Sequence, residues 1–137
     1  MKYLLDSDVV NILYDDSRKE HHEALHRKIS QLVDEDELQT SVLVVCELEY
    51  SFFNAPDDKK GCIRETINSV LSDFDAILPL ELEIAPIFGE LKALLRKVKN
   101  LNRKEMRKHN VDIILASTAI QTSSVLIGMD SIYQYIG

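Results

Sequence analysis

The chain has 137 residues, 45% of them hydrophobic, and a net charge of −7. This length and composition fit one domain, expected over residues 1–137, with a single buried core, and they exclude wholesale disorder. The acidic balance disfavours a protein that coats nucleic acid by charge alone, because such a protein repels phosphates on average.

The amino-terminal part of the chain contains a strand pattern and two helix patterns. An apolar strand over Lys2 to Leu5 is predicted to end at Asp6. Asp8 is the expected N-cap of a short helix from Val9 to Tyr14. The next helix is indicated by an apolar stripe at helical spacing, made of Ala24, Leu25, Ile29, Leu32 and Val33.

Two further helices are predicted in the middle of the chain. A short strand is expected over Leu38 to Thr40, after which Ser41 caps an apolar helix that ends near Phe53. Pro56 is suited to open the following helix, since its fixed φ angle matches a first helical turn. The side chains of that helix expected to face inward are Cys62, Ile63, Ile67, Val70 and Leu71.

The carboxyl-terminal part continues the alternation of strands and helices. Strands are predicted over Ala76 to Leu78 and Val125 to Ile127, and a long helix over Glu81 to Lys99. Asn110 is the expected cap of a helix from Val111 to Gln121. This alternation predicts a three-layer α/β/α domain with a short, mainly parallel central sheet of about four or five strands.

Several absences indicate a cytoplasmic protein with no membrane partner. No apolar run approaches the length of a membrane span, and Asp6 interrupts the apolar start before a signal peptide can form. Cys46 and Cys62 lack metal-site spacing, so we expect two free thiols in a reducing compartment.

Four acidic residues from distant parts of the chain are expected at the carboxyl edge of the sheet, where ligands bind in α/β folds. They are Asp6 after the first strand, Glu47 in the second turn of its helix, Asp112 in a first helical turn, and Asp130 after the last strand. Two carboxylates about 4 Å apart repel by roughly 4 kcal/mol at an effective dielectric of about 20. A Mg²⁺ or Mn²⁺ ion reverses that sign and could activate a water for attack on a phosphodiester.

Each of these acids also has a structural interpretation. Asp6 could be a turn residue, Asp112 could favour the helix dipole, and Asp130 could be an ordinary loop residue. Glu47 lies among apolar residues, where solvation explains an acid poorly, but Glu49 has similar neighbours. Periodicity alone does not choose between these two glutamates.

Four segments of the chain resemble the PIN-domain family, and they occur in the family's order. Residues 4–9, LLDSDV, resemble its opening LDTNV, and residues 41–51 resemble its S-x-x-x-x-x-E-L-x-Y-G helix. Residues 112–119 resemble its D-x-x-I-A-A helix, and residues 126–133 resemble its L-V-T-N-D-x-x-F segment. The chain length resembles that of VapC-type ribonuclease toxins.

The resemblance selects Glu47 over Glu49 and implies a Mg²⁺- or Mn²⁺-dependent endoribonuclease, the toxin of a type II VapBC-like toxin–antitoxin system. A metal-activated water would cleave RNA, the protein would form a homodimer, and a cognate antitoxin would block the site. The catalytic and metal-binding residues that it implies are Asp6, Glu47, Asp112 and Asp130. The chain departs from the family where Asp8 replaces a common Asn and Gly128-Met129 replaces Thr-Asn.

Half of the 16 Lys and Arg residues lie between residues 92 and 108. Two interpretations stay open: the solvated face of a helix and its loop, or a local ridge that binds phosphates. Under the second interpretation, the candidate RNA-binding residues are Arg103, Lys104, Arg107 and Lys108.

Two other functions remain possible from the sequence. In a haloacid-dehalogenase-type phosphatase, Asp6 would be the nucleophile and Asp8 the acid and base, although the further acid expected after Asp130 is missing. A non-catalytic module, either a receiver domain or an inactive PIN scaffold, is the second. A receiver requires a Lys after its last strand, and none follows Ile127.

Overall fold

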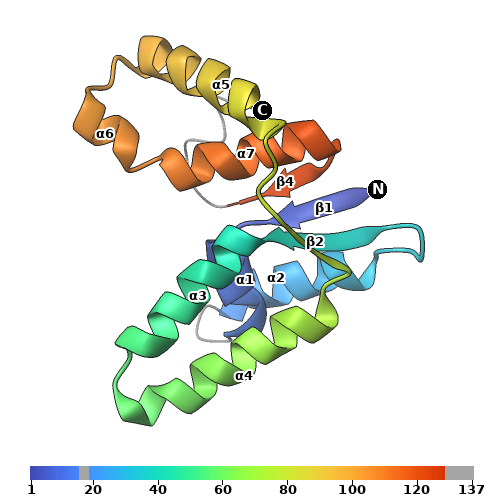
Figure 1. Cartoon of the computed structure of the whole chain (residues 1–137). Coiled ribbons are helices and arrows are strands. Elements are labelled where there is room, and N and C mark those ends of the chain that lie inside the picture. Colours follow the sequence, from blue (N-terminus) through green and yellow to red (C-terminus); the bar gives the residue numbers. More distant parts are fainter. Residues whose placement is uncertain (16–18, 129–137) are drawn as a thin grey trace.

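Helices and strands alternate along the whole part of the chain that the computed structural model describes, residues 1–15 and 19–128 (Figure 1). The elements are β1 (Lys2–Leu5), α1 (Ser7–Tyr14), α2 (Lys19–Ser30), β2 (Glu37–Ser41), α3 (Val42–Asn54), α4 (Asp57–Asp73), β3 (Ala76–Leu78), α5 (Ile84–Lys99), α6 (Arg103–Arg107), α7 (Asn110–Thr122) and β4 (Val125–Ile127).

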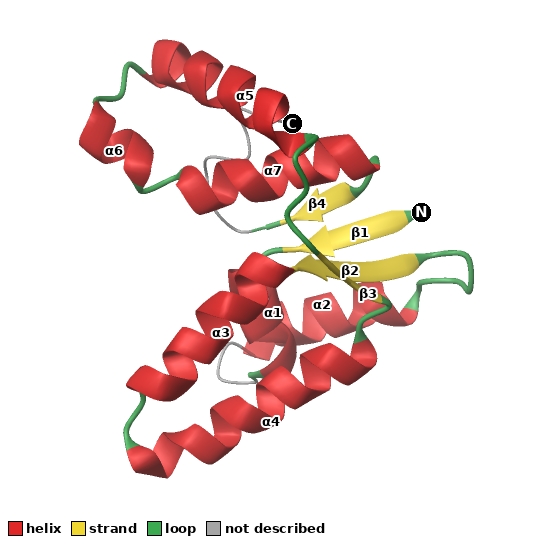
Figure 2. Cartoon of the chain, viewed as in Figure 1, coloured by secondary structure: helices red, strands yellow, loops and turns green. Residues whose placement is uncertain are grey.

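The strands form one four-stranded parallel sheet in the order β3-β2-β1-β4. Leu5 at the end of β1 pairs with Thr40 of β2 and with Ile127 of β4, so the carboxyl ends of the strands meet at one edge. Helices α1 to α4 lie on one side of the sheet and α5 to α7 on the other (Figure 2). The expected three-layer fold with a short parallel sheet is confirmed.

Two clusters of buried apolar side chains hold the layers together. The main core joins β1 to the helices on both sides, for example through Leu5, Val44 of α3 and Leu115 of α7. A smaller core of Leu95, Met106 and Ile113 joins α5, α6 and α7 to one another. Helix α7 contributes to both cores, and it therefore fixes the α5–α6 unit relative to the sheet.

None of the helices in the described chain has the length and apolar content that a membrane crossing requires. In α4 only Ile67 and Val70 are fully buried. The expectation that Cys62 and Leu71 face inward is wrong, because both side chains are exposed. Ile63 packs against the main core as expected.

The predicted bounds of β3 and β4 are confirmed. The capping role of Ser41 is also confirmed, since its side chain accepts a hydrogen bond from the Leu43 amide. The N-cap of α1 is Asp6, not Asp8, because β1 runs into the helix without a linker. Asn110 is the first residue of α7 and not its cap.

Two boundaries in the α5–α7 region also differ from the prediction. Helix α5 begins at Ile84, three residues later than expected, which places Pro86 in the first turn, where its missing N–H breaks no helical hydrogen bond. Helix α6 was not expected. It is only five residues long, and its single buried side chain, Met106, gives too little periodicity to detect.

Thr40 links two strands next to the carboxyl edge, and its removal tests that edge. Its hydroxyl is fully buried and donates to the Leu5 carbonyl at 2.8 Å. We expect Thr40→Val to lower the free energy of unfolding by about 1 kcal/mol, because the volume is kept while a buried hydrogen bond is lost. Chemical denaturation measures this change.

Thr118→Val is the matched control for Thr40→Val. The Thr118 hydroxyl is also buried, but it donates at 2.9 Å to the Ile114 carbonyl within its own helix. A valine at this position keeps the backbone helical. We expect a clearly smaller loss for this variant. Equal losses for the two variants would contradict a special role for the β1–β2 link.

Candidate acidic site at the carboxyl edge of the sheet

Asp6 lies at the centre of the carboxyl edge, directly after the inner strand β1. Its amide donates to the Ile127 carbonyl of β4 at 3.1 Å, and its Oδ1 accepts from the Val9 amide at 3.0 Å. The residue is only 3% exposed. These bonds fix the carboxylate, and the N-terminus of α1 stabilises its negative charge.

Glu47 approaches the same junction from α3. Because Ser41 ends β2 and caps α3, the second turn of that helix returns beside the start of α1. The Ser7 hydroxyl donates to Glu47 Oε2 at 3.3 Å. Sequence reasoning missed Ser7, whose only signal is its position between two acids, Asp6 and Asp8.

The surroundings of Glu47 disfavour its charged form. Although the residue as a whole is exposed, packing around the carboxylate raises its pKa, and the nearby charge of Asp8 raises it further, against the opposing effect of the Ser7 hydrogen bond. Glu49 is different, because it accepts two hydrogen bonds from Arg64 at 2.8 and 2.9 Å, which lower its pKa. Glu47, and not Glu49, therefore lies at the carboxyl edge.

Asp112 lies in the first turn of α7, and its side chain is 21% exposed. Because α7 leads into β4 through Ser123 in a left-handed conformation, the start of α7 lies towards the carboxyl edge. His109 Nδ1 is 3.8 Å from the Asp112 carboxylate, which is too long for a hydrogen bond. His109 was not singled out from the sequence, and its Nδ1 has no hydrogen-bond partner in the described part of the chain.

The described residues do not assemble a complete metal site. In residues 1–15 and 19–128, no three His, Cys, Asp or Glu side chains are close enough to hold a metal ion together. Asp130, the fourth acid predicted from the sequence, lies outside the described residues. The predicted set of Asp6, Glu47, Asp112 and Asp130 therefore stays a prediction.

The chemistry of the described acids nevertheless fits a hard divalent cation. The Val9 amide orients the Asp6 carboxylate, and a cation nearby would offset the desolvation that raises the pKa of Glu47. The side chains predicted as ligands are carboxylates, which Mg²⁺ and Mn²⁺ prefer to the nitrogen and sulfur ligands typical of zinc.

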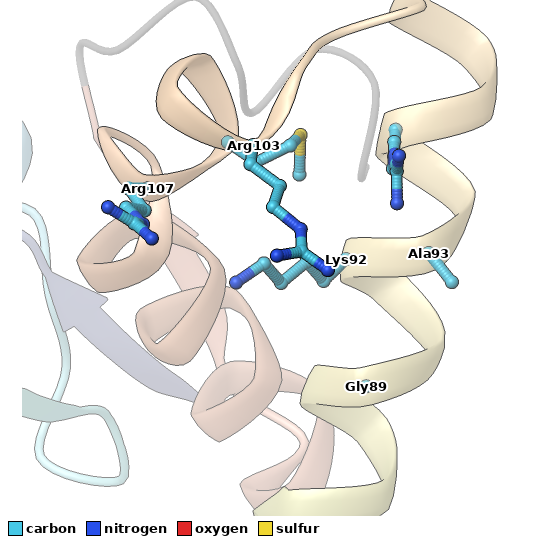
Figure 3. Close-up of a pocket in the computed structure, with 7 residues that line it drawn as sticks. Gly89, Lys92, Ala93, Arg103 and Arg107 are labelled. Carbon is cyan, nitrogen blue, oxygen red and sulfur yellow. The ribbon is translucent and has the colours of Figure 1, made fainter.

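The four basic residues predicted to contact RNA fall into two groups. Arg103 and Arg107 line a pocket between α5 and α6, whereas Lys104 and Lys108 are not part of its lining (Figure 3). Arg107 ends α6 only three residues before α7 begins, so the basic residues lie close in the chain to Asp112.

Comparisons with known proteins agree with this fold. The sequence model of one family, the PIN domain, matches residues 3–136. A search of curated proteins found no match. The solved structures described next are 20% to 22% identical to this chain, so their similarity shows a shared fold alone.

Three of those solved structures are similar over nearly the whole chain. VapBC2 of Rickettsia felis, bound to a promoter DNA fragment, has a TM-score of 0.77 and 20% identity over 99% of this chain and 93% of its own. VapBC-1 of nontypeable Haemophilus influenzae has a TM-score of 0.75 and 22% identity over 99% of this chain and 92% of its own. FitAcB of Neisseria gonorrhoeae has a TM-score of 0.75 and 22% identity over 98% of this chain and 91% of its own.

Replacing each glutamate of α3 separates their electrostatic roles. Because the folded protein raises the pKa of Glu47, its charged form costs stability at pH values above that pKa. We expect Glu47→Gln to raise the melting temperature near pH 7 in EDTA, and the gain to shrink as the pH falls through the folded pKa. Gln keeps an oxygen for the Ser7 hydroxyl.

Glu49→Gln is the control and should act in the opposite direction. The folded protein lowers the pKa of Glu49, so its stabilising contribution is present above the unfolded value and is lost as the pH falls through the folded pKa. The variant should melt below the wild type near neutral pH and match it in acid. Melting curves from about pH 3 to about pH 7 measure both effects; the same sign for the two variants would refute the assignment.

Proposed function

This chain belongs to the PIN domain family, and on that basis we propose that it is a Mg²⁺- or Mn²⁺-dependent endoribonuclease, the toxin of a type II toxin–antitoxin system. The observation that carries the proposal is Asp6, a carboxylate buried at the centre of the sheet's carboxyl edge in the first motif of the family. The Val9 amide holds this carboxylate in place, and a fixed carboxylate is a ligand that Mg²⁺ and Mn²⁺ prefer.

The proposed site consists of Asp6, Glu47, Asp112 and Asp130. Asp6 would supply a carboxylate that its bond to the Val9 amide holds in place, and Ser7 would orient Glu47 through its hydroxyl. Asp112 would supply another carboxylate ligand from the first turn of α7. A bound Mg²⁺ or Mn²⁺ would lower the pKa of a water and offset the charge that develops on the phosphoryl oxygens during RNA cleavage.

The proposed partners are an RNA substrate, a cognate antitoxin protein and a second copy of the chain in a homodimer. Solved structures named as VapBC and FitAcB support the antitoxin proposal through their fold. We place this activity in the cytoplasm, where RNA is available. An inactive PIN scaffold is the alternative; family membership favours neither the phosphatase nor the receiver domain.

RNA cleavage tests the proposed activity directly. The wild type should cut a structured RNA in the presence of Mn²⁺ and should stop when EDTA is added. Asp6→Asn and Asp112→Asn should each reduce the rate by at least about 100-fold, because loss of a metal ligand costs several kcal/mol in the transition state. Asn is itself a good N-cap, so Asp6→Asn should still fold.

Two variants control that assay. Glu49→Gln removes an acid that is paired with Arg64 and should keep activity near the wild-type rate. Asp8→Asn should also cleave RNA, whereas a phosphatase that uses Asp8 as its acid and base would lose activity on small phosphate esters. A folded wild type that cuts no RNA with Mn²⁺ would support the inactive scaffold and overturn the proposal.

Metal binding is tested separately through thermal stability. A ligand that binds only the folded state at about 100 times its Kd stabilises by about 2.7 kcal/mol. Mn²⁺ should therefore raise the melting temperature of the wild type and of Glu49→Gln by several degrees. Asp6→Asn, Glu47→Gln and Asp112→Asn should show a smaller rise. An equal rise in all five proteins would place the metal elsewhere.

A further inference from the structure

A strongly basic pocket of about 460 Å³ lies between α5 and α6. Four of its seven lining residues are cationic, and none is acidic. Figure 3 shows the side chains of Lys92 and Arg103 in the space between the two helices, with Arg107 farther from α5. The lining consists of Gly89, Lys92, Ala93, Arg96, Arg103, Met106 and Arg107.

Helical spacing brings these cations together. Lys92 and Arg96 are four residues apart on α5, and Arg103 and Arg107 are four residues apart on α6, so each pair shares one helix face. Asn100 ends α5 in a left-handed conformation with φ of 52°, and this turn allows α6 to fold back towards α5.

The four cations have no carboxylate partner in the described part of the chain. None of them takes part in a salt bridge, although Lys92 lies 5.5 Å from the centroid of the Phe88 ring. Residues 92–108 contain eight basic residues and one acidic residue, in a chain whose net charge is −7. Favourable interaction with the α5 dipole could explain Arg96 but not the two arginines of another helix.

The floor of the pocket is fixed to the helix that carries Asp112. Met106 is 2% exposed and packs in the small core with Leu95 and Ile113, and Ile113 follows Asp112 directly in α7. The pocket wall formed by α6 also joins the start of α7 through a short connection. An anion in the pocket is therefore held at the same end of α7 as the proposed cleavage site.

We propose that this basic pocket binds phosphate groups of the RNA strand at nucleotides next to the one that is cleaved; this inference rests on the proposed function. Guanidinium groups bind phosphate oxygens through paired hydrogen bonds, and the three arginines supply that geometry. An acidic protein segment is the other anion of suitable charge, but RNA is favoured because the pocket adjoins the start of α7.

A matched pair of double variants in and directly after α6 tests the pocket. Arg103→Gln with Arg107→Gln removes two charges from the lining, and Lys104→Gln with Lys108→Gln removes two charges from neighbouring positions outside it. Binding of a fluorescein-labelled single-stranded RNA of about 12 nucleotides is measured by anisotropy in EDTA, which prevents metal-dependent cleavage. Circular dichroism melts check that both variants fold.

We expect the pocket variant to bind RNA at least about tenfold more weakly than the wild type, and the outer variant to bind within about threefold. The slope of log K against log salt should become shallower by about 1.4 for the pocket variant, as expected for two lost contacts to single-stranded phosphates. Equal losses for the two variants would show that overall charge, and not the pocket, attracts RNA, and would overturn the proposal.

Two further readouts separate this proposal from the proposed function. Binding that depends on the pocket, together with no cleavage in Mn²⁺, would reject the ribonuclease and keep the RNA pocket. Cleavage with unchanged RNA binding by the pocket variant would keep the ribonuclease and reject the pocket. If the pocket variant loses affinity for an oligo-glutamate peptide but not for RNA, the pocket serves an acidic protein and the proposal fails.

Discussion

The hydrogen bond from the Val9 amide to the Asp6 carboxylate is the constraint on which the carboxyl edge depends. It makes one residue both the end of the inner strand and the cap of the helix that follows. Because Asp6 also donates its own amide to Ile127, the same residue ties β1 to β4. This buried residue therefore connects three elements, β1, α1 and β4, through its carboxylate and its backbone amide.

Helix α7 connects the sheet to the second half of the molecule, because it contributes to both hydrophobic cores. Leu115 places the helix in the main core, while Ile113 places it in the small core with Leu95 and Met106. Helix α7 thus links the α5–α6 unit to the main core of the sheet. The position of the basic pocket and the position of Asp112 are consequences of the same packing.

Most of the sheet and the order of the elements could be predicted from the sequence, because short apolar runs and a capping serine leave clear local patterns. The cap of α1 could not, since Asp6 and Asp8 both satisfy the local preference and only the direct strand–helix junction decides between them. The sequence also grouped Arg103 with Lys104. Only the folding of α6 against α5 separates a lining residue from its outward neighbour.

Under the proposed function, the two charged regions explain how an acidic protein would act on an anionic substrate. The proposed site of carboxylates would repel RNA until a cation is bound, and the raised pKa of Glu47 reflects the local cost of charge at that edge. Basic residues concentrated in 92–108 offset this repulsion close to α7 without neutralising the acids themselves. Net charge therefore describes this molecule poorly, because the proposed attraction of RNA and the proposed binding of a cation require opposite charges at separate places on one fold.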